Sequence, residues 1–214
     1  MLTDLHPNTP AWREASLRSE GGWLGFVDGS VDAARAGVEV LKRVTFASAS
    51  SPAAAAAAAA ARPKQGAAAG KMFRLFSLAF HHFDDELAER ILKNTLENSA
   101  GFAIFELQGR DAGNLFTVLA MAPVLMAGSW WWYWGDWWHL FFTYLIPVVP
   151  FVVVFDGLVS CLRTRREAEI MRLLHEASAG VEGGLQGWRF EVGEERHTWP
   201  VGMISYFIGV KQGT

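Results

Sequence analysis

The sequence predicts an α/β protein built on a mainly parallel sheet, and three observations support this fold class. Residues 72–80 form a near-continuous apolar run of strand length, and residues 102–107 form a second short apolar run. The amphipathic helix predicted between them is long enough for a crossover, which favours two neighbouring parallel strands. Residues 188–192 and 203–210 are aromatic and β-branched runs, typical of an antiparallel pair that closes the edge of a sheet.

The helices are predicted from caps and from the spacing of apolar residues. Asp84 or Asp85 can cap the helix after the first of these strands, and one apolar stripe runs along it until Gly101: Leu87, Ile91, Leu92 and Leu96. An earlier helix begins near Pro10, and a short strand is predicted at residues 23–27. Residues 156–179 again show an amphipathic pattern and predict a second helix that covers the sheet.

Composition divides the chain into three parts. Residues 1–46 are mixed in composition and are predicted to be a remnant of a cofactor-binding half. Residues 47–70 are alanine-rich and contain too few large apolar side chains for a core, which predicts a disordered linker or a surface insertion. Residues 71–214 are predicted to be the second half of the domain, with an apolar helical hairpin at residues 115–155 inserted into it.

The hairpin prediction depends on residues 115–155, where Asp136 is the only formal charge. Apolar stretches of about 20 residues, the length that crosses a bilayer core, lie on both sides of Gly135. Arginines flank the segment, which predicts that both ends and the bulk of the chain lie on the cytoplasmic side: Arg110, Arg163, Arg165 and Arg166. Tryptophans crowd the turn, where an interfacial aromatic belt is expected: Trp130, Trp131, Trp132, Trp134, Trp137 and Trp138.

Two other interpretations of this segment stay open. Pro123, Pro147 and Pro150 would kink or end helices, so the segment could instead be a buried or substrate-facing lid of a soluble domain. A monotopic insertion, with aromatic side chains in the headgroup layer, is also compatible with the composition. Membrane contact of some kind is the favoured prediction, and crossing versus monotopic contact is left undecided.

Composition and missing motifs exclude several classes of function. A net charge of -3 gives no electrostatic support for nucleic-acid binding. The single cysteine, Cys161, cannot form an internal disulfide. The sequence has no Gly-x-Ser-x-Gly elbow, no phosphate-binding Gly-x-x-x-x-Gly-Lys and no Cys-x-x-Cys, so hydrolase, nucleotide-hydrolysing and disulfide-redox functions lose their main support.

Four polar residues are candidates for a site. Asp4 could be a ribose-binding carboxylate at a strand end or simply the cap of the following helix, and Asp32 lies in the loop after the next predicted strand. His81 and His82 follow the strand at residues 72–80, and either could act as a general base or bind substrate. Adjacent histidines at an extended strand end point to opposite faces, so no metal site is predicted.

The order of the segments TDLHPN, SVDA, MFRLFSLAFHHFDD, GFAIFEL and FTYLIPVVPFVVVFDGLVSCLRT resembles class I S-adenosylmethionine-dependent methyltransferase-like proteins. The resemblance implies an incomplete Rossmann-like methyltransferase sheet with S-adenosylmethionine as cofactor. It implies that Asp4 holds the ribose hydroxyls and that Asp32 lies near the adenine amino group. It also implies that His81 and His82 belong to the catalytic segment, which faces cofactor and substrate. The family's first strand and glycine-rich loop should precede Asp4, which predicts an N-terminally truncated domain.

This resemblance leads to two hypotheses about function. The first is a membrane-associated methyltransferase for a lipophilic small molecule, weakly active or inactive as this chain because the cofactor pocket would lack its floor. The second is a non-catalytic, membrane-associated remnant that acts by protein interaction. In that case exposed sheet edges would pair with another copy or with a partner chain.

Overall fold

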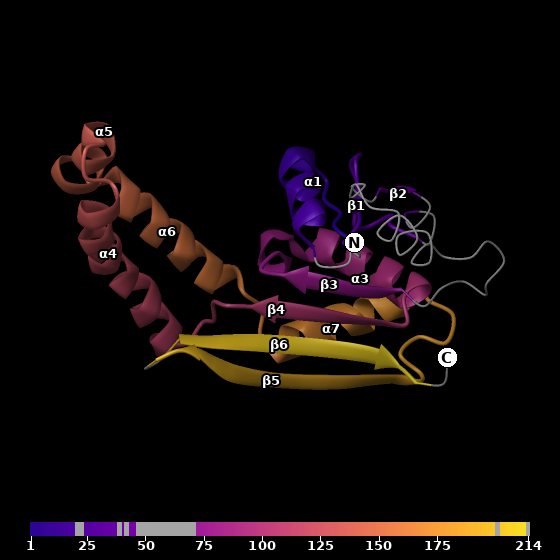
Figure 1. Cartoon of the computed structure of the whole chain (residues 1–214). Helices are drawn as coiled ribbons and strands as arrows, with labels where there is room; N and C mark the ends of the chain where they lie inside the picture. The colour runs from indigo at the N-terminus through magenta and orange to yellow at the C-terminus, as the bar shows by residue number, and fades with distance from the viewer. Residues whose placement is uncertain (20–23, 38–39, 41–42, 46–71, 200–201, 213–214) are drawn as a thin grey trace.

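The computed structural model of this chain describes residues 1–19, 24–37, 40, 43–45, 72–199 and 202–212. The linker predicted at residues 47–70 lies outside these residues. The fold is α/β, as predicted, and its main sheet has four strands in the order β3-β4-β6-β5. Figure 1 shows this sheet with helices packed along it and a long helical hairpin projecting from one end.

The strand pairing confirms the predicted parallel pair and the predicted antiparallel pair, but not a mainly parallel sheet, because among the described strands of this sheet only β3 and β4 pair in parallel. Strands β3 (Phe73–Ser77) and β4 (Gly101–Glu106) are adjacent and parallel, with Phe73 opposite Gly101. Strands β5 (Trp188–Thr198) and β6 (Gly202–Lys211) form an antiparallel pair, and β6 is also antiparallel to β4. The sheet is therefore mixed, with the later hairpin strand, β6, placed inside and β5 at the edge.

Helices α3 (Asp85–Asn98) and α7 (Glu167–Ser178) cover one face of this sheet. Asp84 caps α3 by accepting a hydrogen bond from the Leu87 N–H, as predicted, although the helix ends at Asn98 and Gly101 begins β4. The apolar stripe of α3 meets that of α7 over the aromatic face of the sheet, and the core includes Ile91, Leu92, Leu96, Phe102, Leu173, Leu174 and Phe207. Burial of these side chains is the main favourable term for this packing.

The strand predicted at residues 72–80 is shorter than expected. β3 ends at Ser77 because Leu78 adopts a left-handed conformation with φ of 53°, and a 3-10 turn, η3 (Phe80–His82), follows. A leucine in this region is strained because its Cβ crowds the backbone. His81 and His82 therefore lie on a turn and not at an extended strand end, which corrects the expectation that they point to opposite faces.

The hairpin consists of α4 (Ala112–Trp132), α5 (Trp137–Leu140), the π-helical turn η4 (Phe141–Leu145) and α6 (Val148–Arg163). It leaves the sheet at the carboxyl ends of β3 and β4, and its tip lies far from the sheet (Figure 1). The two long helices approach closely at Gly157, where an added Cβ would lie 2.8 Å from Val118 Cγ1. Glycine at this position permits the close packing.

The prediction of one covering helix over residues 156–179 was wrong. Residues up to Arg163 continue α6, and α7 begins only at Glu167. The backbone turns extended at Thr164 and Arg166, and the Arg166 N–H donates to the Glu169 carboxylate at the start of α7. Each helix has its own buried face: α6 packs against α4, and α7 packs against α3 and the sheet. The amphipathic pattern therefore continues through both helices.

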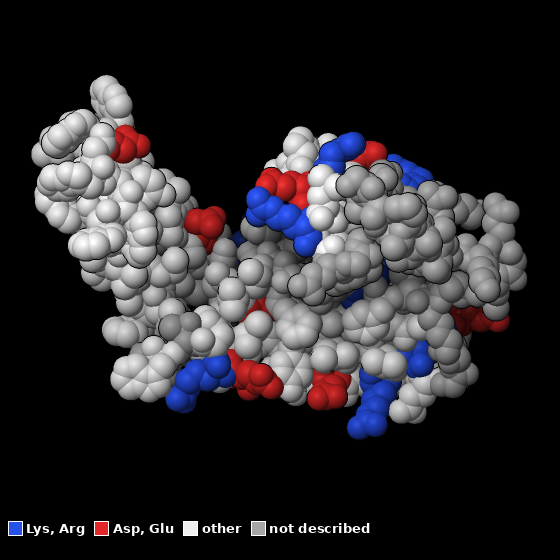
Figure 2. Space-filling model, viewed as in Figure 1, with Lys and Arg blue, Asp and Glu red and all other residues white. Residues whose placement is uncertain are grey.

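The helices of the hairpin have the length and composition of membrane-spanning segments. α4 is long and apolar enough to cross a membrane, and residues 137–145 and 148–163 pass the same test together with a bend of 64° between them. In the view of Figure 2 the projecting arm is almost entirely white, whereas blue and red side chains gather over the rest of the molecule. Charged groups thus avoid most of the visible surface of the hairpin.

The amino-terminal part contains α1 (Thr9–Arg18) and a small antiparallel sheet of β1 (Phe26–Val27) and β2 (Val44–Thr45). Leu2 forms a parallel bridge with Phe26. The strand predicted at residues 23–27 is thus confirmed only at Phe26 and Val27, because Leu24 and Gly25 are not in a strand and residue 23 lies outside the described part. Asn8, not Asp4, caps α1, accepting from the Ala11 N–H.

A buried arginine joins this part to the main sheet. Arg74 on β3 donates to the carbonyls of Ala33 and Ala36 and to the side chains of Asn94 and Thr95 on α3. Burial lowers the pKa of the Arg74 guanidinium to about 10, so it remains charged at neutral pH. The hydrogen bonds offset part of the cost of removing this charge from water.

Candidate functional site

The centre of the candidate site is a buried histidine–glutamate pair. His81 Nδ1 lies 2.7 Å from Glu106 Oε2, and the His81 backbone N–H donates to Glu106 Oε1 over 3.0 Å. Both side chains are almost completely buried, at 5% and 6% exposure. β4 supplies Glu106 and the turn after β3 supplies His81, so the parallel pairing of these strands brings the two together. A carboxylate that is hydrogen-bonded to one ring nitrogen fixes the orientation of an imidazole.

Two arginines from the base of the hairpin hold the histidine turn from the other side. Arg163, the last residue of α6, donates to the carbonyls of His81 and His82. Arg165 donates to the carbonyls of Phe80 and Phe83, and its guanidinium lies 5.5 Å from the centre of the Phe80 ring. The backbone of the turn is therefore fixed directly to the end of the hairpin.

Three ion pairs extend this contact to α3 and α7. Asp85 binds Arg165 and Arg172, and hydrogen bonds from these two arginines lower the pKa of the Asp85 carboxyl. Glu169 binds Arg110, which precedes α4. Burial opposes ionisation of Glu169, but hydrogen bonds from the Arg166 N–H and from Arg110 outweigh it, so the pKa is lowered. Both ends of the hairpin are thus anchored to the sheet domain through arginine.

The two predicted histidines differ in their surroundings. His82 is exposed, while His81 is buried, and their ring centres lie 4.1 Å apart. Proximity of the rings removes the geometric objection to a shared metal. The part of the chain that the structure describes nevertheless contains no group of three or more His, Cys, Asp or Glu side chains arranged to hold a metal ion.

Asp4 and Asp32 lie next to each other in the amino-terminal part. The Val31 N–H donates to the Asp4 carbonyl over 2.8 Å, which places Asp32 one residue away from this contact. Both side chains are exposed and close local turns, Asp4 with the His6 N–H and Asp32 with the Ala34 N–H. This backbone contact places the two residues near one another. Among the described residues, no hydrogen bond or ion pair joins either of them to His81 or Glu106.

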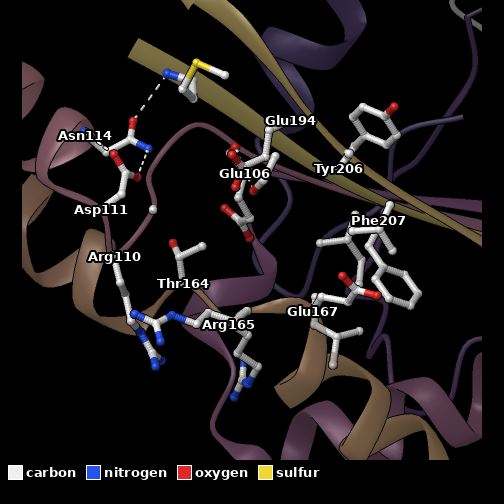
Figure 3. A pocket seen from close by; sticks show the side chains of 18 residues that line it. Glu106, Arg110, Asp111, Asn114, Thr164, Arg165, Glu167, Glu194, Tyr206 and Phe207 are labelled. Carbon is white, nitrogen blue, oxygen red and sulfur yellow. Dashed lines mark hydrogen bonds between the residues drawn. The ribbon is translucent and has the colours of Figure 1, made fainter. Parts of the chain in front are cut away.

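A cavity of about 420 Å³ lies between the sheet, the start of α4 and the start of α7. Glu106 and Glu194 extend into it from β4 and β5, and Thr164 and Glu167 lie on the helix side (Figure 3). Its apolar wall includes Ile104, Ile170, Val192, Met203 and Phe207. A second cavity of about 280 Å³ is lined by His81 and by the arginines of the hairpin base. The His81–Glu106 pair therefore contributes one side chain to each cavity.

Glu106, Arg163 and Arg165 are site residues that the candidate list from sequence missed. Glu106 carried a signal, since it shares the core face of β4 with Phe102 and Ile104, and a carboxylate at such a position requires a partner. No signal in the sequence indicates the roles of Arg163 and Arg165, because each binds a turn that lies about 80 residues earlier in the chain. Both had been identified only as flanking charges of the hairpin.

Comparison of the chain with protein-family models, with curated proteins and with solved structures gives no match.

Proposed function

We propose that this chain belongs to a membrane-associated, S-adenosylmethionine-dependent methyltransferase-like protein that acts on a lipophilic molecule. One observation carries the proposal: the apolar hairpin leaves the domain at the edge of the sheet where the buried His81–Glu106 pair lies. Ligands of open α/β sheets bind at the carboxyl ends of the strands. An acceptor dissolved in the membrane would therefore meet the domain next to this pair.

Membrane attachment is supported by the length and surface of the hairpin. α4 has 21 residues and is about 31 Å long, which matches a hydrocarbon core of about 30 Å. At its tip, six tryptophans expose more than half of their surface: Trp130, Trp131, Trp132, Trp134, Trp137 and Trp138. We propose that the hairpin crosses the bilayer, with this belt at the far interface and the arginines at the cytoplasmic one.

The chain's own residues suit the cofactor that the resemblance implies only in part. Asp4 Oδ1 accepts from the His6 N–H, and Oδ2 has no hydrogen-bond partner among the described residues, so it could accept a ribose hydroxyl. In this proposal Asp32 would hold the adenine end, although Arg35 lies 3.7 Å from its second oxygen. When bound, S-adenosylmethionine would supply an electrophilic methyl group. Because both carboxylates are exposed and occupied in turns, we expect weak binding.

In this proposal the buried pair handles the proton of the acceptor. Glu106 holds Nδ1 of His81 and leaves Nε2 of the ring to take a proton, as a general base requires. The arginine contacts fix the turn so that the ring keeps its position. His82, exposed beside it, would contact the acceptor.

Two measurements on the full chain test the proposal separately. In flotation with phosphatidylcholine vesicles, the chain should rise with the lipid, and a variant with Trp131, Trp134 and Trp137 changed to Ser should rise less. Equilibrium dialysis with S-adenosylmethionine should show weak binding that Asp4→Ala reduces and Glu97→Ala, at an exposed position on α3, does not. Recovery of the chain in the lipid-free fraction would refute attachment, and absence of any binding would refute the cofactor assignment.

The second candidate, a non-catalytic protein that acts by interaction, is favoured by the free edge of the sheet. β3 has no partner on its outer side among the described strands, and Phe73 and Leu75 are 55% and 61% exposed on it. Such an edge can pair with a strand of another chain. Light scattering in detergent should then show self-association that Leu75→Lys abolishes and Ser77→Lys, whose parent side chain is polar, affects less.

A further inference from the structure

The turn between β5 and β6 is apolar, although it lies at the surface. Its sequence, residues 199–203, reads Trp-Pro-Val-Gly-Met and carries no charge. Surface turns are usually built from Gly, Pro, Asn, Asp and Ser, and an exposed apolar run is rare without a function. Trp199 is 82% exposed, the highest value among the large apolar side chains of the described residues, whereas Trp12 and Trp188 are half-buried. The turn therefore presents a large aromatic side chain to the surroundings of the protein.

The two strands carry this turn beyond the end of the sheet. Glu106, the last residue of β4, pairs with Ser205, and Ser205 pairs with Glu194. Residues 195–204 therefore extend past β4 as two strands alone, and we call them the β5–β6 ribbon. A strand rises about 3.3 Å per residue, so residues 195–198 carry the turn about 13 Å past the end of β4. Because β5 runs in the same direction as β4, the ribbon projects at the edge of the sheet where the helical hairpin leaves, and it ends beside the base of α4 (Figure 1).

A hydrogen bond joins the β5–β6 ribbon to the helical hairpin. The Met203 N–H donates to Asn114 Oδ1 over 3.5 Å, and Asn114 lies in the first turn of α4 (Figure 3). Asn114 is buried, and both its backbone N–H and its side-chain amide donate to the carboxylate of Asp111, the N-cap of α4. These bonds leave the side-chain oxygen of Asn114 toward the ribbon. Since Arg110 precedes the cap and marks the proposed cytoplasmic interface, the ribbon lies level with that interface.

We infer that the β5–β6 ribbon is a second membrane contact, in which Trp199 enters the headgroup layer of the cytoplasmic leaflet beside the helical hairpin. The indole ring combines an apolar body with one N–H donor, and tryptophan is enriched at this depth of a bilayer for that reason. The inference rests on the membrane attachment in the proposed function. A contact beside the hairpin restricts rotation of the sheet domain about it. The larger cavity, lined by both Met203 and Asn114, would then be held next to the lipid surface.

The test places a nitrobenzoxadiazole label at Arg196→Cys on the ribbon, in a Cys161→Ala background, with the full chain in phosphatidylcholine nanodiscs that hold one chain each. Phosphatidylcholine with a nitroxide on its headgroup should quench this label strongly. The same label at Glu182→Cys, before the other end of β5, should be quenched weakly. Adding Trp199→Ser should lower the quenching at position 196 to the level at position 182. Trp131→Ser removes a tryptophan of nearly equal exposure, 80%, from the hairpin tip and is the matched control, which should leave the quenching at position 196 unchanged.

Equal quenching at positions 196 and 182, or quenching at position 196 that Trp199→Ser does not change, would overturn the inference. A label at Asp136→Cys, at the hairpin tip, separates this result from a failure of the proposed function. If the nitroxide lipid quenches the label at position 136 but not the label at position 196, the hairpin is attached and only the second contact is refuted. If it quenches neither label, the membrane attachment itself is refuted, and the inference with it.

Discussion

At the scale of single residues, two neighbours in sequence contribute differently to stability. His81 is buried against Glu106 and His82 is exposed, although the two are adjacent and of the same type. A buried carboxylate without its partner is costly because the low-dielectric interior does not replace water around it. Of the two histidines, His81 therefore contributes more to the free energy of unfolding.

We predict that His81→Ala lowers the free energy of unfolding by about 2 to 3 kcal/mol, because it leaves the Glu106 carboxylate without its side-chain partner. His82→Ala should cost less than about 0.5 kcal/mol, as surface changes do. Urea denaturation of the detergent-solubilised chain, followed by circular dichroism, measures both. Equal losses for the two variants would contradict the burial of the pair.

Asp85 gives a prediction about pH. Hydrogen bonds from Arg165 and Arg172 lower its pKa in the folded protein from the ordinary value of 3.8, so the folded state releases this proton more readily than the unfolded state. Its stabilising contribution is therefore present above pH 3.8 and is lost as the pH falls through the lower folded value. Melting temperatures measured across this range should fall less steeply for Asp85→Asn than for the parent chain.

The Asp85 contribution should also shrink in high salt, because the carboxylate is largely exposed and screened. Glu97→Gln, which changes a carboxylate on the same helix without these contacts, is the control for the general effect of removing a charge. If the melting temperature of Asp85→Asn fell as steeply at acidic pH as that of the parent chain, the arginine pairs would not contribute to stability.

At the scale of elements, close packing holds the hairpin together while its outer surface stays apolar. α4 and α6 meet where Gly157 faces Val118, and the side chain of Tyr144 donates to the Met126 carbonyl near the tip. Small residues at such crossings allow helix backbones to approach, which matters most where lipid gives no hydrophobic drive for association. The two helices thus pack against each other, and the apolar side chains on the outer surface of the hairpin stay exposed.

We predict that Gly157→Val destabilises the hairpin by about 2 kcal/mol, because the new side chain would overlap that of Val118. The double variant with Val118→Ala should recover part of this loss, since the opposing methyl groups are then absent. Thermal unfolding in detergent, followed by circular dichroism, measures the cycle. Ala127→Val, at an exposed position of α4, should have little effect, and additive losses in the double variant would argue against the contact.

At the scale of the whole molecule, the arginines at the hairpin base connect an apolar arm to a polar domain. Arg110 and Arg163 mark the two ends of the arm, and both bind groups of the sheet domain. A membrane around the arm would therefore lie close to the candidate site. The proposed crossing also makes a definite statement about which side of the bilayer the tip reaches.

We predict that the tip lies on the far side of the membrane from the sheet domain. A fluorescent nitrobenzoxadiazole label at Asp136→Cys, in a Cys161→Ala background, should be protected from dithionite added outside sealed vesicles that carry the domain outward. The same label at Glu182→Cys, in the exposed turn before β5, should be quenched at once. Rapid quenching at position 136 would instead favour a monotopic arm.

The sequence by itself determined the features that local pattern controls. Two short apolar runs and the capped amphipathic helix between them predicted the parallel pair, and the long stretch with a single formal charge predicted the hairpin. Local pattern failed at Leu78, whose left-handed backbone ends β3 early, and near Thr164, where two helices were read as one.

Only the tertiary structure decided what the candidate site contains. Glu106 meets His81 across 25 residues of chain, and Arg163 meets the same turn across about 80. The cavity combines side chains from β4, β5, β6, the start of α4 and the start of α7. The physical reason is that periodicity reports which face of an element is buried, whereas the partner of each buried polar group depends on how separate elements pack.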